Sequence, residues 1–441
     1  ETWQAFHNAA QTGDVQKIGE LIRNRVDVNI KNRNGWTPLL TATYYDKSNV
    51  VELLTRNGAD INFKDNDGFS PLYTASFNGY ERIVQILIEK VADVNIRNKR
   101  GTAPIIAAAQ EGHGRVVELL LKNGANVNSQ NNFGSTPLYW ASRKGHTNVV
   151  ELLIRNGADV NLKDNDEESP IYIASFYGQT NIVELLTRNG ADVNLKEKGG
   201  YSPLYTSSFS GYERIVQILL EKGADVNIRN KNGSAPIIVA AQEGHGRVVE
   251  LLLKNGANVN SKNNIGSTPL YWASREGHTN VVELLIRNGA DINLKDRDGD
   301  SSLYTASLNG HGRVVELLLK NGANVNSQNN IGSTPLYWAS NKGHTNVVEL
   351  LIRNGADINL KDNDGDSPLY TASFGGHERV VQILLEKGAD VNISNNKGTV
   401  PIIVAAQEGH GRVVELLLKN GANVNSQNKF GSTPLYWASN K

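Results

Sequence analysis

The chain of 441 residues contains no cysteine and no methionine. The absence of cysteine excludes disulfides, thiolate zinc sites and a cysteine nucleophile. No apolar run approaches the ~18 residues that a membrane-spanning helix needs. The 45 basic residues equal the 45 acidic ones, so there is no excess charge to attract nucleic acid or an anionic membrane. We therefore expect a cytoplasmic protein that contacts neither.

Proline, by contrast, occurs at a regular spacing. Consecutive prolines are 33 residues apart, except for one gap of 66 in which Ser302 takes the expected place. The 12 prolines stand at 38, 71, 104, 137, 170, 203, 236, 269, 335, 368, 401 and 434. An asparagine recurs at the same period from Asn29 to Asn425 without a substitution. A period of this length indicates a supersecondary unit that buries its apolar face only against stacked neighbours.

The local signals within one unit predict two helices and an extended turn. Thr136 and Pro137 are a helix N-cap and a first helical residue, and Gly145 ends that helix. The run VVELLI at 149–154 predicts a second helix with a broad apolar face, and Gly157 ends it in the left-handed conformation. The Asn- and Asp-rich segment that follows has the chemistry of a turn.

Four motifs at period 33, namely G-x-T-P-L-x-x-A, G-H, V-V-x-L-L and G-A-D-V-N, resemble those of the ankyrin-repeat family. The resemblance implies an all-α solenoid of antiparallel helix pairs, each with a short β-hairpin finger projecting at right angles. It covers residues 1–441 as a single domain of about 13 units and the start of a fourteenth. Residues 1–33 are then a degenerate N-terminal capping repeat, residues 34–429 are twelve full repeats, and residues 430–441 are a truncated repeat.

The chain departs from the family pattern at several positions. The family's usual histidine after Pro-Leu appears only as His7, and most other units have a tyrosine there, such as Tyr139. The first unit has Ala5 in place of the proline. Val91 replaces a turn glycine, where a left-handed backbone would cost roughly 1–2 kcal/mol. Glu167 replaces a glycine of the finger.

Three types of unit alternate along the chain. They begin with SPLYTASF, with API (for example APIIVAAQEG) and with TPLYWAS, and are called here the Phe, Gln and Trp types. Their order repeats as a block of 99 residues, with an odd unit at Pro170 and a shortened block at Ser302. This pattern indicates recent duplication of whole blocks. Agreement between the copies is therefore weak evidence of functional constraint.

Three positions of each first helix, the third, sixth and seventh after the proline, point away from the packed side on a helical wheel of 100° per residue. The resemblance implies that this side and the fingers line a concave groove that binds protein partners. The candidate partner-binding residues are Tyr44, Tyr45, Phe77, Trp140, Arg143, Phe176, Tyr177, Phe209, Trp272, Arg275, Trp338 and Phe374. Exposed, these rings would exceed the ~300–600 Å² apolar patch normal for a monomer. Alternatively, each ring folds down onto the helix of the next unit.

The histidines and the acidic turns have a structural interpretation. Eight histidines, from His113 to His410, occupy one position after a helix-ending glycine, and the resemblance makes them hydrogen-bonding turn residues. Equivalent positions would lie roughly 10 Å apart, too far to share a metal with ligand distances of ~2.0–2.1 Å. Acidic fingertips such as DNDG at Asp65 lack the glutamate that a calcium-binding loop needs. We expect no metal site.

The periodic asparagines are expected to bond their own backbone and hold the finger. The resemblance adds a second hypothesis, because ankyrin asparagines after L-x5-D-V/I can be substrates of an asparaginyl hydroxylase. Asn62, Asn161 and Asn359 fit that spacing.

These features predict a monomeric protein-interaction scaffold that binds a protein or peptide. No phosphate loop, Ser/His/Asp set or converging carboxylate pair is present, so we expect no enzymatic activity, cofactor or small-molecule substrate. The alternative is a recognition or spring-like arm of a larger protein, such as a channel, toxin or microbial effector, with its activity outside this segment. Because a solenoid needs a polar terminal cap and none is visible near Trp437, we expect the natural chain to continue.

Overall fold

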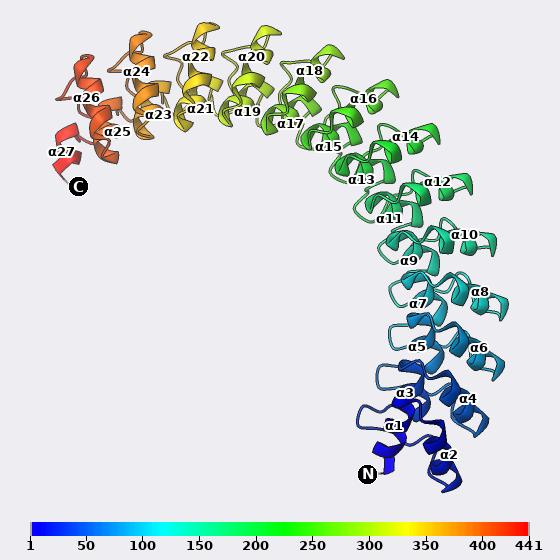
Figure 1. The fold of residues 1–441 in the computed structure, drawn as a ribbon. Coiled ribbons are helices and arrows are strands. Elements are labelled where there is room, and N and C mark those ends of the chain that lie inside the picture. Colours follow the sequence, from blue (N-terminus) through cyan, green and yellow to red (C-terminus); the bar gives the residue numbers. More distant parts are fainter. Residues whose placement is uncertain (1, 440–441) are drawn as a thin grey trace. The chain divides into compact units, whose positions relative to one another are not determined.

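The computed structural model describes residues 2–439, and these form 27 α-helices. Each repeat of about 33 residues contributes a first helix, with an odd number, and a second helix, with an even number (Figure 1). The first helices are α1 (Thr2–Thr12), α3 (Pro38–Tyr44), α5 (Pro71–Asn78), α7 (Pro104–Glu111), α9 (Pro137–Lys144), α11 (Pro170–Phe176), α13 (Pro203–Ser210), α15 (Pro236–Gln242), α17 (Pro269–Glu276), α19 (Ser302–Leu308), α21 (Pro335–Lys342), α23 (Pro368–Phe374), α25 (Pro401–Glu408) and α27 (Pro434–Ser439).

The second helices have nine residues each, as in α2 and α10. They are α2 (Val15–Arg23), α4 (Ser48–Arg56), α6 (Glu81–Glu89), α8 (Gly114–Lys122), α10 (Thr147–Arg155), α12 (Thr180–Arg188), α14 (Glu213–Glu221), α16 (Gly246–Lys254), α18 (Thr279–Arg287), α20 (Gly312–Lys320), α22 (Thr345–Arg353), α24 (Glu378–Glu386) and α26 (Gly411–Lys419). Lengths of six to eleven residues for the first helices and nine for the second are too short to be stable alone, so packing must hold them.

The helix termini form as the sequence predicts. The hydroxyl of Thr136 accepts a hydrogen bond from the backbone N–H of Tyr139 at 3.0 Å, and Pro137 occupies the first helical position. Gly145 ends α9 with a φ of 86°. The side chains of Ala103 and Ala235 cannot accept such a bond, so α7 and α15 begin without a side-chain cap. These helices therefore depend more heavily on burial of their apolar faces.

Two compact units divide the chain. The N-terminal unit comprises Glu1–Ser207 and Arg214–Asp225, and the C-terminal unit comprises Ser208–Glu213 and Val226–Lys441. Within each unit the first helices pack against one another in one row and the second helices in another, for example α5 on α7 and α6 on α8. Valine and leucine side chains such as Val149, Val150 and Leu153 are buried between the rows. Burial between rows is the source of stability expected for stacked repeats.

The fingers are tight turns, and the short β-hairpins expected from the resemblance are not formed as strands. Within residues 2–439 the one β-bridge joins Lys295 to Ser301. In the finger at Asp65 the backbone N–H of Asp65 bonds the carbonyl of Phe69 at 3.1 Å. The return bond from the N–H of Phe69 goes to the carboxylate of Asp65, at 2.8 Å, instead of to its carbonyl. The aspartate side chain thus replaces one half of the ladder that would define a hairpin.

Candidate interaction groove

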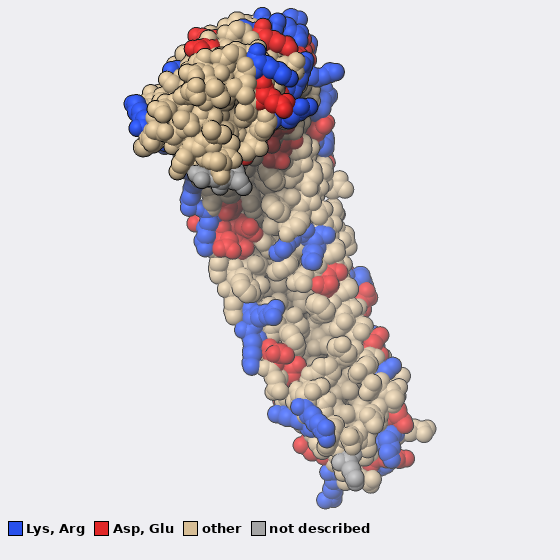
Figure 2. All heavy atoms as spheres, turned by 90° about the vertical axis from the view of Figure 1, so that its left-hand side faces the viewer, with Lys and Arg blue, Asp and Glu red and all other residues tan. Residues whose placement is uncertain are grey.

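Two adjoining cavities open on the side of the N-terminal unit that the odd-numbered helices and the fingers form. The larger has a volume of about 530 Å³ and is lined by α5, α7, α9 and three successive fingers. The smaller, of about 380 Å³, extends from Trp36 to Asn78. Both are lined by Phe69, Tyr73 and Phe77, so they form one groove. Figure 2 shows this side of the N-terminal unit, in the lower part of the picture, as mostly uncharged residues with separate groups of basic and acidic side chains.

Aromatic rings form the floor of this groove. The rings of Phe69 and Tyr73 stack with centroids 4.9 Å apart and an angle of 13° between their planes. Phe77 continues the stack at 6.4 Å from Tyr73. At the other end the guanidinium of Arg143 lies 5.2 Å from the Trp140 ring and 5.3 Å from the Tyr177 ring. Such cation–π contacts orient the arginine and hold the tryptophan in place.

The predicted partner-binding residues divide by exposure. The phenylalanines and tyrosines at these positions are exposed, whereas the tryptophans are half-buried. The exposed ones are Tyr44, Tyr45, Phe77, Phe176, Tyr177, Phe209 and Phe374. The half-buried ones are Trp140, Trp272 and Trp338, and their indole N–H groups are buried without a hydrogen-bond partner. The tryptophans thus fit the prediction that each ring folds down onto its neighbours. The phenylalanines and tyrosines fit the alternative prediction that the rings are exposed.

The structure brings only part of the predicted set together. Tyr44, Phe77, Trp140 and Arg143 line the groove of the N-terminal unit. Phe209, Trp272, Arg275, Trp338 and Phe374 lie in the C-terminal unit, where the Arg275 guanidinium sits 5.1 Å from the Trp272 ring. Whether any of these residues contacts a partner stays a prediction.

Several groove residues were missed from the sequence because they belong to the fingers. Trp36 and Phe69 stand two residues before the proline, and Phe133 stands four residues before it. Phe133 is 62% exposed, and Ile265 and Ile331 at the equivalent fingertip position are exposed as well. An apolar residue at the tip of a polar turn was the available signal, since turn chemistry does not require it.

The tyrosine that replaces the family's histidine is an inter-repeat hydrogen-bond donor. The Tyr139 hydroxyl donates to Oε2 of Glu168 in the next finger at 2.6 Å. In the first repeat His7 makes an equivalent contact with the next repeat. Its Nδ1 lies 2.7 Å from the Thr41 hydroxyl, and its Nε2 lies 3.0 Å from the Ile30 carbonyl. Burial lowers the pKa of His7 and raises the pKa of Tyr370 to about 12, so both stay neutral near pH 7.

Carboxylates gather at one end of the groove. Asp164, Asp166 and Glu168 all line the cavity, and Asp166 is paired with Lys198 at 3.1 Å. Burial, reinforced by the neighbouring carboxylates, raises the pKa values of Asp164 and Glu168. The Asp164 carboxylate accepts backbone N–H bonds from Asp166 and Glu168, both at 2.9 Å, which limits the rise. These groups are therefore partly desolvated at the rim of an open groove.

The turn histidines join consecutive repeats, as the resemblance implies. His278, for example, places Nε2 2.9 Å from the carbonyl of Gln242 in the preceding unit. The same bond to the residue 36 positions earlier is made by His113, His146, His245, His278, His311, His344, His377 and His410. Residues 2–439 contain no group of three or more His, Asp or Glu side chains placed to hold a metal ion.

The periodic asparagines act between repeats, which corrects the expectation that they bond their own backbone. The amide oxygen of Asn161 accepts the backbone N–H of Asp192, 31 residues later, at 2.8 Å. Asn62 and Asn359 make the same bond to Asp93 and Asp390. The bond to the local backbone is made instead by the side chain two positions before the asparagine. The carboxylate of Asp60, for example, accepts the backbone N–H of Asn62 at 3.1 Å.

Hydroxylation of Asn62, Asn161 and Asn359 stays a prediction.

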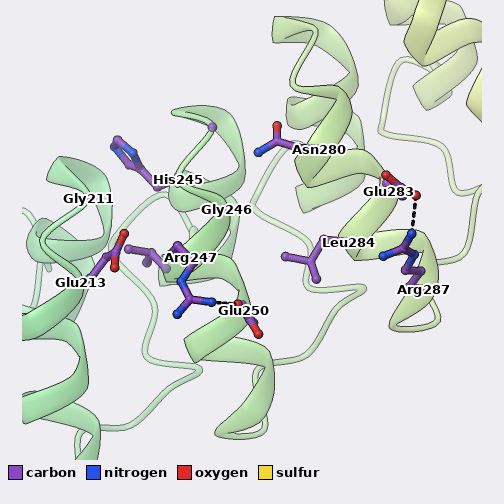
Figure 3. Close-up of a pocket in the computed structure, with 12 residues that line it drawn as sticks. Gly211, Glu213, His245, Gly246, Arg247, Glu250, Asn280, Glu283, Leu284 and Arg287 are labelled. Atoms are coloured by element: carbon purple, nitrogen blue, oxygen red, sulfur yellow. Dashed lines mark hydrogen bonds and ion pairs between the residues drawn. The ribbon is translucent and has the colours of Figure 1, made fainter.

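A different kind of hollow lies on the side of the second helices. In the C-terminal unit a cavity of about 480 Å³ opens beside the first turn of α16, where Gly246 replaces the larger residues that begin α18 and α24 (Figure 3). Its charged walls are satisfied locally, since Arg247 pairs with Glu250 at 2.7 Å along the same helix. The groove of the N-terminal unit, with its aromatic floor and exposed fingertips, is the stronger candidate for a partner.

Comparisons with known protein families agree with this architecture. A family model described as ankyrin repeats (3 copies) matches residues 6–98, 82–164, 156–230, 204–296, 237–329 and 302–395. A second, described as ankyrin repeats (many copies), matches residues 384–436. A search of curated proteins finds no match. No helix among residues 2–439 is long and apolar enough to cross a membrane.

Proposed function

The chain belongs to the ankyrin-repeat family, and from this premise we propose that it is a scaffold that binds a protein or peptide in the groove over α5, α7 and α9. Ankyrin repeats are in general protein-interaction modules. The observation that carries the proposal is that aromatic residues line the groove at both ends, from Trp36 to Phe77 and from Phe133 to Trp140, bordered by polar fingers. Aromatic and arginine side chains at the centre of a groove with a polar rim are the usual energetic anchors of protein interfaces.

The exposed members of this floor provide the test. Phe77 and Phe133 are both exposed, so replacing them with serine removes apolar contact area without opening the core. Peptides would be selected from a displayed random library against the intact chain, and their affinities compared for wild type and the double variant Phe77→Ser, Phe133→Ser. We expect the double variant to bind at least about tenfold more weakly, the effect of losing one or two anchors.

A matched control removes an apolar side chain of similar exposure outside the groove. Val91 is 84% exposed at the end of α6 and does not line either cavity. Val91→Ser is expected to leave peptide affinity unchanged. If the selected peptides bound the double variant as tightly as wild type, the groove would not be the binding surface.

A further inference from the structure

The three fingertips that border the larger cavity differ in charge. The fingertip at 97–102 reads RNKRGT and is basic, the next at 130–135 reads QNNFGS and is uncharged, and the third at 163–168 reads KDNDEE and is acidic. The order along the groove is therefore basic, apolar, acidic. Each fingertip lines the cavity with three residues, among them Arg100, Phe133 and Asp166, which are the fourth residue of each.

Backbone hydrogen bonds hold these fingertips in a continuous row. The N–H of Asn132 donates to the carbonyl of Arg100 at 2.9 Å, and the N–H of Asn165 donates to the carbonyl of Phe133 at 2.9 Å. The three tips cannot move independently without breaking these bonds. The charge order is thus a fixed property of the groove surface.

The two ends of the groove are not neutralised by their own lining. Among the residues that line the cavity, Arg100 is the charged group at the basic end, whereas Asp164, Asp166 and Glu168 share the cation Arg143 at the acidic end. Lys198, outside the lining, pairs with Asp166 at 3.1 Å, so two cations face three carboxylates there. Arg143 is itself held against the rings of Trp140 and Tyr177. The raised pKa values of Asp164 and Glu168 show that burial and mutual repulsion of these carboxylates outweigh the stabilisation of their charge. A cation supplied by a partner would relieve this repulsion.

We propose that the groove selects an extended, dipolar peptide segment, with an acidic side chain at the Arg100 fingertip, an apolar side chain against Phe133 and Trp140, and a basic side chain at the Asp166 fingertip. This inference rests on the proposed function of the groove and specifies its ligand. Two stacked repeats span about 16–20 Å, which corresponds to about five or six residues of extended chain at ~3.3 Å each.

A weaker charge gradient occurs in the C-terminal unit, where the three fingertips carry net charges of +2, +1 and −1 instead of +3, 0 and −3. Its fingertips at 229–234, 262–267 and 295–300 read RNKNGS, KNNIGS and KDRDGD. They are joined by the same bonds, from Asn264 to the Asn232 carbonyl and from Arg297 to the Ile265 carbonyl, each at 2.9 Å. Block duplication accounts for this second row, so it offers a second place to bind without being independent evidence.

Three synthetic peptides with one central phenylalanine test the proposal. One has two glutamates at one end and two arginines at the other, about six residues apart, one has arginines at both ends and one has glutamates at both ends. Affinities for the full chain would be measured by fluorescence anisotropy at low ionic strength. We expect the dipolar peptide to bind about three- to tenfold more tightly than either of the others, the range for one or two exposed charge pairs.

Charge reversal at one end of both rows should change this preference predictably. With Arg100→Glu and Lys231→Glu the net charges of the two basic fingertips fall from +3 to +1 and from +2 to 0, so the advantage of the dipolar peptide over the doubly basic peptide should shrink. With Asp166→Arg and Asp298→Arg the net charges of the two acidic fingertips change from −3 to −1 and from −1 to +1, so the advantage of the dipolar peptide over the doubly acidic peptide should shrink. Combining all four substitutions should bring the affinities of the three peptides close together, and circular dichroism checks that the variants are folded.

The outcomes separate this inference from the proposed function. If all three peptides bound equally to wild type, or if the substitutions left the relative affinities of the peptides unchanged, the dipolar inference would be overturned. If binding still weakened in Phe77→Ser, Phe133→Ser, the groove would remain the binding surface. If neither the preference for the dipolar peptide nor the weakening in the double variant were observed, both proposals would be overturned.

Discussion

The Tyr139 hydroxyl donates a 2.6 Å hydrogen bond to Oε2 of Glu168, which lies 29 residues later in the chain and one repeat further along the stack. This bond ties the first helix of one repeat to the finger of the next. It also places a half-buried carboxylate beside an aromatic ring at the rim of the groove. Glu168 therefore belongs both to the contacts between repeats and to the lining of the proposed binding groove.

Glu168 should contribute to a pH dependence of stability. Its pKa is raised by burial, partly offset by the bond from Tyr139. The resulting stability is fully present below the ordinary pKa of a glutamate and is lost as the pH rises through the raised value. Glu168→Gln keeps an acceptor for Tyr139 and cannot ionise. Relative to wild type the variant should gain stability between about pH 4 and pH 7, by no more than about 1 kcal/mol because the group is half-exposed.

Urea denaturation at a series of pH values measures this difference. Glu167→Gln, at the exposed neighbour, is the control. An equal, pH-dependent gain in both variants would show that net charge, and not the environment of Glu168, is responsible.

Val91 should be a strained residue whose replacement stabilises the protein. It has a φ of 66°, in the region that glycine occupies at this turn of other repeats, and its side chain is 84% exposed. Val91→Gly relieves a cost of roughly 1–2 kcal/mol but adds about 0.5–1 kcal/mol of chain entropy, so a net gain of up to about 1 kcal/mol is expected. Thermal or urea unfolding monitored by circular dichroism measures it.

The reverse change at an equivalent turn is the matched control. Gly124 has a φ of 89°, and a Cβ there would meet nothing within 4 Å. Gly124→Val should destabilise by a similar amount for backbone reasons alone. A stability change of the same sign in the two variants would contradict the strain argument.

The asparagine that connects the fingers should contribute measurably to stacking. Asn161 accepts the N–H of Asp192 at 2.8 Å and donates to the carbonyl of Gly190 at 3.3 Å. Asn161→Ala leaves both groups without these partners and should cost about 1–2 kcal/mol of unfolding free energy. Asn425 occupies the equivalent position in the last repeat, and residues 2–439 contain no later finger whose N–H it could accept. Asn425→Ala should therefore change stability little. Equal losses at the two positions would refute an inter-repeat role.

The histidine and glycine of adjacent turns should be sterically coupled. A Cβ on Gly244 would lie 2.7 Å from the imidazole of His278, whereas one on Gly256 would meet nothing within 4 Å. Both glycines have positive φ, 77° and 87°. Gly244→Ala should therefore cost about 1–2 kcal/mol more than Gly256→Ala, because it adds a clash to the same backbone strain. Combining Gly244→Ala with His278→Ala should remove part of that excess.

The helical unit could be predicted from sequence because its signals are local. Thr136, Pro137 and Gly145 begin and end α9 where the pattern indicates, and Val91 and Glu167 have the left-handed backbone expected of glycine positions. The finger differs from expectation because the Asp65 carboxylate accepts an N–H that a hairpin would pair with a carbonyl. Several arrangements of such a turn are locally acceptable, so the sequence does not choose between them.

The candidate site was only partly predictable. The helical wheel places Phe77 and Trp140 on the outward side, yet Phe77 is exposed and Trp140 is half-buried. The difference arises because Arg143 covers the indole and Tyr139 packs edge-on against it at 5.7 Å. A wheel gives the direction in which a side chain leaves the helix, but its exposure depends on the neighbours that fold over it.

The sequence by itself determined the period of 33, the helix termini and the charge and type of each fingertip, because each depends on residues a few positions apart. Only the tertiary structure decided which side chains meet across repeats, as Tyr139 meets Glu168 and Asn161 meets Asp192. The physical reason is that such contacts, 29 and 31 residues apart, depend on how one rigid unit stacks on the next. Stacking is set by the sum of many apolar contacts between units, and no local pattern in the sequence records it.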